Sequence, residues 1–213
     1  MLYRATRDGF SAADFWRCCA GKGPTLTLVK VSSTQATPSQ RLRGRGRSFA
    51  PSTSSIDSAR RCVSVGVQVA GNGFVCGAFT PISWPADAAG ASCWVADPSG
   101  RSFLFPLVNA HGRAVKLRLQ DVDRGEALNL DGDDHGLGFG RGADLRLMCC
   151  EAADKPQGCF TLPHSFELDH EAEAATGLAP IPFEYDQKLL AGDDAKGESI
   201  VAFGAAEIEV YQL

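Results

Sequence analysis

Acidic residues cluster in residues 131–136, which read Asp-Gly-Asp-Asp-His-Gly and invite comparison with a calcium-binding loop. Such a loop supplies oxygen ligands at its first, third and fifth positions, glycine at the sixth and a bidentate glutamate at the twelfth. Here the fifth position is His135 and the twelfth is Gly142. Because the bidentate acid is missing, we expect no metal here and interpret the segment as a solvated acidic loop.

Glycine occupies every second position from 136 to 142, as in some phosphate-binding loops. The dinucleotide pattern fails because Arg141 and Ala143 stand at the third-glycine positions of its two possible frames. No Lys-Ser or Lys-Thr step makes a P-loop, and the apolar residues from Asp144 onward alternate as in a strand. We interpret the glycines as structural and expect no cofactor.

His164, Ser165 and Asp169 are the residue types of a hydrolytic triad. A triad is a spatial arrangement, however, and neighbouring residues on a strand point to opposite faces. The sequence also lacks a recognisable nucleophile elbow. We expect no catalytic residues, with hydrolytic chemistry kept as an alternative.

Eight cysteines raise the alternative of thiol chemistry. Neither C-x-x-C nor paired Cys/His metal spacing is present. Cys18 and Cys19 are directly adjacent, as are Cys149 and Cys150, and adjacency disfavours a disulfide within each pair. The apolar surroundings of Cys76 and Cys93 favour thiols acting as small hydrophobic residues. We expect reduced thiols in a reducing compartment. The cysteines are at positions 18, 19, 62, 76, 93, 149, 150 and 159.

Composition and charge limit the class of protein. The chain has 213 residues, an ordinary globular composition, no secretory signal at its start and no apolar run of membrane-spanning length. We expect a soluble cytoplasmic protein with one domain over 1–213. Residues 32–62 contain six arginines and one aspartate, a net charge of +5, so the rest of the chain carries −9 of the total −4. An acidic body argues against nucleic acid and favours a basic protein surface as partner.

Short alternating strands dominate the elements that the sequence predicts. A capping box at Ser11 and Asp14 begins a helix that ends at residues 21–24, and a strand follows at 25–29. Further strands are expected at 74–80, 93–96, 102–105, 115–119, 144–148 and 207–211. In the last of these, Ile208 and Val210 face inward and both glutamates face outward. The pattern predicts a β-rich (α+β) fold, a two-sheet antiparallel β-sandwich with a few short flanking helices.

Residues 32–62 interrupt this pattern. The segment is rich in Ser, Thr and Arg and lacks apolar periodicity, so we expect a disordered insertion that the core tolerates. After it, residues 63–69 alternate up to an Asn-Gly step that reads as a hairpin with 74–80. Either 25–31 or 63–70 could therefore be the strand beside 74–80.

Five motifs follow one another along the chain: residues 2–10 with 21–28, 74–80 with Trp84, 103–105 with Leu107 and Asn109, 138–145, and finally 165–167 with 190–192 and 207–211. In this order they resemble the TLDc family, the oxidation-resistance type of TBC/LysM-associated domain. The motifs cover 1–31 and about 72–213, and the ordered set is much more specific than any one of them. The stretch 138–145 is similar to the family's Phe-Gly-Gly-Gly-(His or Asp)-Asp-Leu segment. Ala78 and Arg141 depart from the usual glycines. The family-motif residues, expected to be structural, are Tyr3, Arg4, Asp8, Gly9, Gly77, Phe79, Trp84, Gly138, Phe139, Gly140, Asp144, Leu145, Glu209 and Val210.

The resemblance implies a β-sandwich without agreed catalytic residues, found in proteins linked to oxidative-stress resistance and in several that bind the V-ATPase proton pump. We therefore expect a non-catalytic domain that binds a protein, the V1 peripheral sector of the pump, and reaches a membrane only through that partner. A generic scaffold is the further alternative, and the chain could be a solitary domain or a fragment. Asp131, Asp133, Asp134, Glu207 and Glu209 are the acidic residues predicted to contact the partner.

Overall fold

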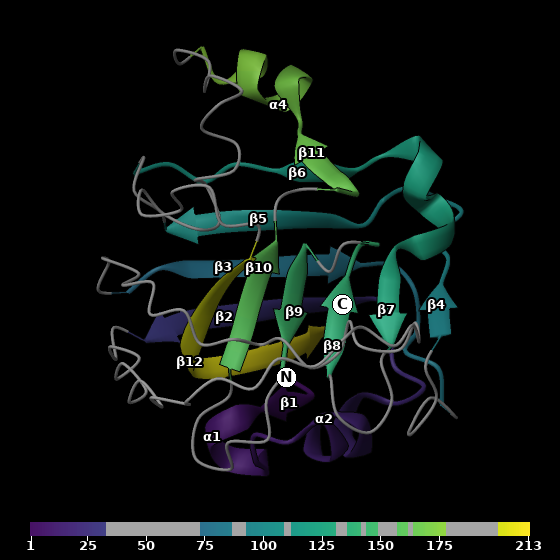
Figure 1. The fold of residues 1–213 in the computed structure, drawn as a ribbon, viewed down its shortest axis with the longest axis vertical. Coiled ribbons are helices and arrows are strands. Elements are labelled where there is room, and N and C mark those ends of the chain that lie inside the picture. Colours follow the sequence, from purple (N-terminus) through teal and green to yellow (C-terminus); the bar gives the residue numbers. More distant parts are fainter. Residues whose placement is uncertain are drawn as a thin grey trace, which may run out of the picture.

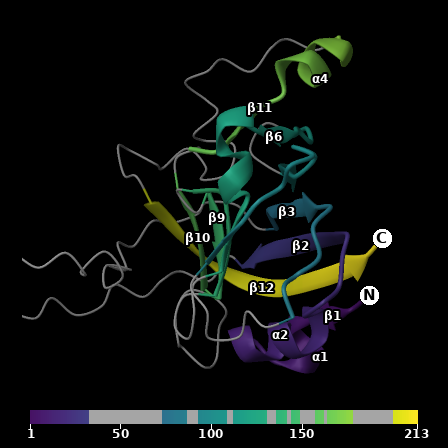
Figure 2. The same ribbon diagram turned by 90° about the vertical axis from the view of Figure 1, so that its right-hand side faces the viewer.

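The computed structural model describes residues 1–32, 73–86, 93–108, 112–130, 136–141, 144–148, 157–161, 164–177 and 200–213. These residues form two layers of antiparallel strands with short helices near the ends of the layers (Figure 1, Figure 2). The β-rich two-sheet fold predicted from the alternating segments is confirmed.

The first layer contains the strands at the two ends of the chain, together with β2 (Thr25–Ser32), β3 (Val75–Thr80), β5 (Phe103–Val108), β6 (Leu117–Leu119) and β11 (Phe166–Leu168). Its order is β11, β6, β5, β3, β2 and β12 (Ile200–Gln212), with β1 (Tyr3–Arg4) also paired to β12. In Figure 2 this layer stands beside the second one. Within the first layer, the N-terminal strand β1 pairs with the C-terminal strand β12.

The second layer continues the same hydrogen-bonded ladder from β12. It contains β10 (Gln157–Thr161), β9 (Leu145–Leu147), β8 (Leu137–Phe139), β7 (Leu128–Leu130) and β4 (Cys93–Val95), in that order. Residues 200–204 of β12 pair with β10, whereas residues 204–212 pair with β2, with a register shift between Ala205 and Glu207. Such a bulge lets one strand bend and serve both layers. The strands of the second layer run across those of the first in Figure 1.

The neighbour of β3 is now known. Thr25–Lys30 of β2 pair with Val75–Thr80 along one edge of β3, and β5 pairs along the other edge. Both edges of β3 are occupied, so 25–31 is the strand beside 74–80 and the predicted hairpin with 63–70 is wrong. The segment 63–70 itself lies outside the described residues, as does all of the predicted insertion except Ser32.

Short helices flank the layers. They are α1 (Ala5–Asp8), α2 (Ala12–Cys19), the 3-10 helix η1 (Asp121–Glu126) and α4 (His170–Ala175). The predicted capping box of α2 is confirmed, because the Asp14 amide donates to the Ser11 hydroxyl at 3.1 Å and the Ser11 amide donates to the Asp14 carboxylate at 3.2 Å. In the part of the chain that the structure describes, no helix has the length and apolar character needed to span a bilayer.

An aromatic cluster joins the N-terminal helices to both layers. The Phe15 ring lies edge-on to Tyr3 and to Trp84, with centroids 5.7 and 5.2 Å apart, and Trp84 lies edge-on to Phe139 of β8 at 6.1 Å. All four side chains are buried. Edge-to-face pairs of this kind stabilise by about 0.5–1.5 kcal/mol each beyond their area burial. The cluster ties the N-terminal segment to the middle of the sandwich.

Candidate functional site

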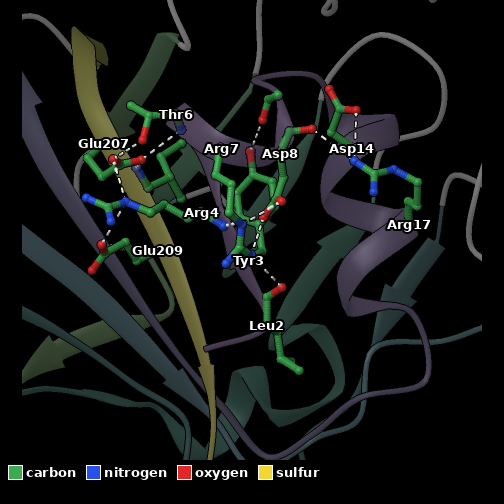
Figure 3. A network of polar contacts seen from close by, with 12 residues as sticks. Leu2, Tyr3, Arg4, Thr6, Arg7, Asp8, Asp14, Arg17, Glu207 and Glu209 are labelled. Carbon is green, nitrogen blue, oxygen red and sulfur yellow. Dashed lines mark hydrogen bonds and ion pairs between the residues drawn. The ribbon is translucent and has the colours of Figure 1, made fainter.

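The N-terminal segment is attached to β12 by a polar network. Arg4 of β1 lies opposite Glu209, and its Nε reaches Glu207 Oε2 at 3.1 Å and Glu209 Oε1 at 3.4 Å (Figure 3). The Thr6 amide donates to Glu207 Oε1 at 3.0 Å, and the Thr6 hydroxyl donates to the other carboxylate oxygen. Glu207 therefore ties the first turn of the chain to its last strand.

A second carboxylate closes the same network from within the N-terminal segment. Asp8 accepts from the Arg4 amide at 2.8 Å and pairs with the guanidinium of Arg7 at 2.7 Å, while Arg17 donates to the Asp8 carbonyl at 2.9 Å. The pairing with Arg7, helped by the Arg4 amide, lowers the pKa of Asp8 to about 2. Asp8 is consequently ionised at any physiological pH.

Tyr3 and Gly9 fix the turn beneath this network. The buried Tyr3 hydroxyl donates to the Gly9 carbonyl at 2.7 Å, and burial raises the pKa of Tyr3 above its usual value. Gly9 has φ +108°, and an added Cβ would lie 2.1 Å from the Asp14 carboxylate. Only glycine fits this position without moving the α2 cap.

Glu207 and Glu209 were predicted to be exposed partner contacts, and the prediction that they are exposed is wrong. They lie on the face opposite Ile208 and Val210, as the alternation predicts, but their side chains are only 16% and 23% exposed and both are paired with Arg4. Although partial burial raises the pKa of Glu207, its hydrogen bonds with Thr6 and Arg4 lower that pKa below its usual value. The sequence could not show this, because Arg4 lies at the opposite end of the chain.

The Asp144 carboxylate organises a second cluster, in the motif that follows β8. Asp144 is fully buried and accepts three backbone N–H groups, from His164 at 3.1 Å, Ser165 at 2.9 Å and Phe166 at 2.8 Å. Burial raises the pKa of Asp144, and the three donors act in the opposite direction. The carboxylate holds the start of β11 against the turn after β8.

Gly140 makes this close approach possible. It has φ +81°, its amide donates to the Ala127 carbonyl at 2.9 Å, and an added Cβ would lie 3.1–3.2 Å from Ser165, Asp144 and Phe166. The next residue, Arg141, donates its amide to the Ser165 hydroxyl at 2.8 Å and sends its side chain outward to Glu126 at 3.1 Å. The departure from the family's glycine run therefore falls on an exposed side chain.

Two of the three triad residue types, Ser165 and Asp169, have side chains engaged in contacts within the fold. Ser165 is buried and its hydroxyl accepts from Arg141, whereas the neighbouring His164 is exposed. Asp169 caps α4 by accepting from the Ala172 amide at 3.1 Å and pairs with Lys116 at 3.4 Å. These contacts of Ser165 and Asp169 hold backbone segments in place.

The remaining motif residues occupy tight or buried positions. Trp84 donates from Nε1 to the Thr25 hydroxyl at 3.0 Å, and an added Cβ on Gly77 would lie 2.1 Å from the Thr27 carbonyl. The departure at Ala78 is buried in β3, and Phe79 beside it is partly exposed. Gly138, Phe139, Leu145 and Val210 are buried. The predicted partner contacts Asp131, Asp133 and Asp134 lie outside the described residues.

Four cysteines belong to the described residues with their side chains, and all four are free thiols. Burial raises the pKa of both Cys19 and Cys76 to about 12, which keeps these thiols protonated and unreactive at neutral pH. Cys18 is partly buried and Cys93 is exposed. Within the described ranges, no three His, Cys, Asp or Glu side chains are grouped as metal ligands.

Asp97 is a buried carboxylate that was not predicted from the sequence. Asp97 accepts from the amides of Ser99 and Ser102 at 3.0 and 2.8 Å and from both hydroxyls at 2.6 and 2.7 Å. Burial raises its pKa, but these four donors lower it below the usual value. The Asp-Pro-Ser-Gly run at 97–100 was the available signal, because Asp side chains bond to the backbone of such turns.

The TLDc domain family matches residues 1–213, the whole chain. The chain therefore belongs to the TLDc domain family. No curated protein matches the sequence significantly.

Proposed function

We propose that this TLDc domain is a non-catalytic interaction module that docks on the V1 peripheral sector of the V-ATPase in the cytoplasm and thereby contributes to oxidative-stress resistance. Family membership across residues 1–213 is the observation that carries the proposal. The pump and the stress role follow from the resemblance of the motifs to this family.

The geometry of the motif residues supports binding over chemistry. Asp144 and Glu207 direct their carboxylates at N–H and O–H groups of neighbouring segments. Trp84 and Tyr3 direct their polar atoms at partners within the core. A catalytic group must be aimed at a substrate position, whereas these groups hold loops and strand ends in place. Such a rigid body is suited to presenting a surface.

The acidic charge of the chain suggests how the domain would dock on a basic surface. The chain carries −9 outside residues 32–62, and acidic groups at the rim of an interface act mainly on encounter rate and salt dependence. Because Glu207 and Glu209 are recessed and paired, we assign the steering role to the loop aspartates Asp131, Asp133 and Asp134. Association should weaken as ionic strength rises to about 0.15 M, where the Debye length is roughly 8 Å.

The test measures association of the purified chain with immobilised V1 sector. Reversing the three loop aspartates to lysine should slow association several-fold at low salt without lowering the melting temperature. A control with Asp123→Lys, Glu151→Lys and Glu171→Lys makes the same change in net charge at positions scattered along the sequence and should slow association less. If V1 shows no binding at low salt, or if the clustered variant associates as fast as the original chain, the proposal is wrong.

A further inference from the structure

The alternation of β2 is inverted relative to an ordinary sandwich strand over its first four residues. Thr25 and Thr27 are fully buried in the core, whereas Leu26 and Leu28 are partly exposed on the outer face. An antiparallel sheet with one solvated face normally places its apolar residues inward. The Thr27 hydroxyl is also buried without a hydrogen-bond partner among the described residues. The two apolar side chains, Leu26 and Leu28, therefore lie on the outer face, and the two threonines lie in the core.

The apolar outer face extends across the neighbouring strands. Leu26 lies opposite Phe79 of β3, which lies opposite Phe103 of β5, and Phe105 lies opposite Gly77. The Phe79 and Phe103 centroids are 5.1 Å apart, and those of Phe103 and Phe105 are 5.9 Å apart. We call this surface the outer aromatic strip, made of Leu26, Leu28, Phe79, Phe103 and Phe105.

The strip is bordered by cations that stand further into solvent than their acidic partners. Arg4 is 47% exposed against 16% for Glu207, and Lys116, whose Nζ lies 5.2 Å from the Phe103 centroid, is 46% exposed against 14% for Asp169. Arg118 lies opposite Phe103 in register and is 53% exposed, against 46% for its partner Glu167.

Lys30 completes this border. It follows Leu28 on the same face of β2 and is exposed, and no ion pair is seen for it among the described residues. A body that is acidic overall therefore presents positive side chains around an apolar centre on this face.

We propose that the outer aromatic strip binds an acidic amphipathic segment of another protein. Its aliphatic or aromatic side chains would cover Phe79, Phe103 and Phe105, and its carboxylates would meet Arg4, Lys30 and Arg118. An apolar centre with a charged rim is the usual anatomy of a protein interface. Because the acids beside Arg4, Lys116 and Arg118 reduce the net charge, the face attracts a dense phosphate surface less than a segment with a few matched carboxylates. The assignment is independent of the pump.

The probe is a phage-displayed library of random peptides selected on the immobilised full chain. Enriched peptides should combine Asp or Glu with Leu, Ile or Phe, and synthetic copies should bind Phe79→Thr/Phe103→Thr at least about tenfold more weakly. Val122→Thr, which removes an 86% exposed apolar side chain elsewhere, should bind as the original chain does. Peptides without acidic bias, or peptides that bind the double variant equally, would overturn the proposal.

Two further measurements keep the result decisive. Lys30→Gln/Arg118→Gln leaves the aromatic residues intact and should weaken peptide binding several-fold even if the phenylalanine variant fails to fold, and unchanged binding would count against the proposal. Sedimentation of the chain alone and flotation with phosphatidylserine vesicles examine other occupants. Self-association or flotation that disappears in either double variant would assign the face to a second copy or to a membrane surface, and would overturn the peptide assignment.

Discussion

The turn around Asp144 buries a charged side chain, whereas the outer aromatic strip leaves apolar side chains at the surface. Asp144 is charged by type, yet it is fully buried and bound to three backbone N–H groups of the chain. Phe79 and Phe103 are apolar by type, yet they lie on the outer face, are only partly buried and contact each other. A buried polar group with all its partners inside the chain indicates structure, whereas apolar groups left at the surface indicate a contact still to be made.

The largest expected effect is that of Asp144→Ala. The change leaves three amides without an acceptor, those of Ser165 and Phe166 buried and that of His164 partly buried. Because each buried unpaired group costs about 1–3 kcal/mol, we expect a loss of about 3 kcal/mol or more in the free energy of unfolding. Urea denaturation measures it. Glu171→Ala removes an exposed carboxylate and should change stability by less than about 0.5 kcal/mol. If the two variants are equally stable, the buried carboxylate does not hold the turn.

Gly140→Val should come next. A β-branched residue at φ +81°, with its Cβ 3.1–3.2 Å from three neighbours, combines backbone strain and overpacking, and we expect a loss of about 2–4 kcal/mol. Gly125→Val is the matched control, because Gly125 has no positive φ and open space around its Cβ. Near-normal thermal stability of the Gly140 variant would mean that the turn relaxes freely.

Glu207→Gln should lower the free energy of unfolding by less than about 1 kcal/mol, because its ion pair with the half-exposed Arg4 is screened by solvent.

The pKa values of Asp8 and Glu207 are lowered in the folded state, so their contribution to stability is present at neutral pH and is lost as pH falls through those values. The pKa of Asp144 is raised in the folded state, so its contribution to stability is present at low pH and weakens as pH rises through that raised value. Carboxyl NMR titration should find Asp144 above, and Asp8 and Glu207 below, their ordinary pKa values, and a reversed order would contradict the electrostatic account.

The smallest effect is expected from deleting residues 33–61. The segment offers few apolar side chains to bury, and loop closure costs only about 0.6 kcal/mol for each doubling of loop length. The melting temperature should change by no more than a few degrees. A larger fall, measured by calorimetry, would show that the segment packs against the sandwich.

Much of the fold was predictable from local patterns. Ser11 and Asp14 mark the start of α2, and the inward positions of Ile208 and Val210 follow from the period of two in β12. The phase of β2 was not predictable, because alternation of Thr and Leu gives a period without stating which set is buried. Tertiary contacts decide it: Trp84 donates to the Thr25 hydroxyl, so the threonine face turns inward.

The polar clusters were less predictable, because their partners are distant in sequence. Asp144 and Gly140 stand in a recognisable motif, but the amides that Asp144 binds belong to residues 164–166. Glu207 looked exposed in an alternating strand, and Arg4 and Thr6 cover it from the opposite end of the chain. Periodicity describes one strand at a time, whereas exposure depends on what folds over that strand.

Binding of the purified V1 sector tests the central claim most directly. Co-sedimentation of the chain with V1 at low salt, at concentrations where each is well resolved alone, should show a saturable complex that dissociates as salt is raised. The same complex should form with Glu207→Gln, since that carboxylate holds the N-terminal segment. Absence of a complex at low salt would contradict the account and would leave this TLDc domain as a scaffold for other partners.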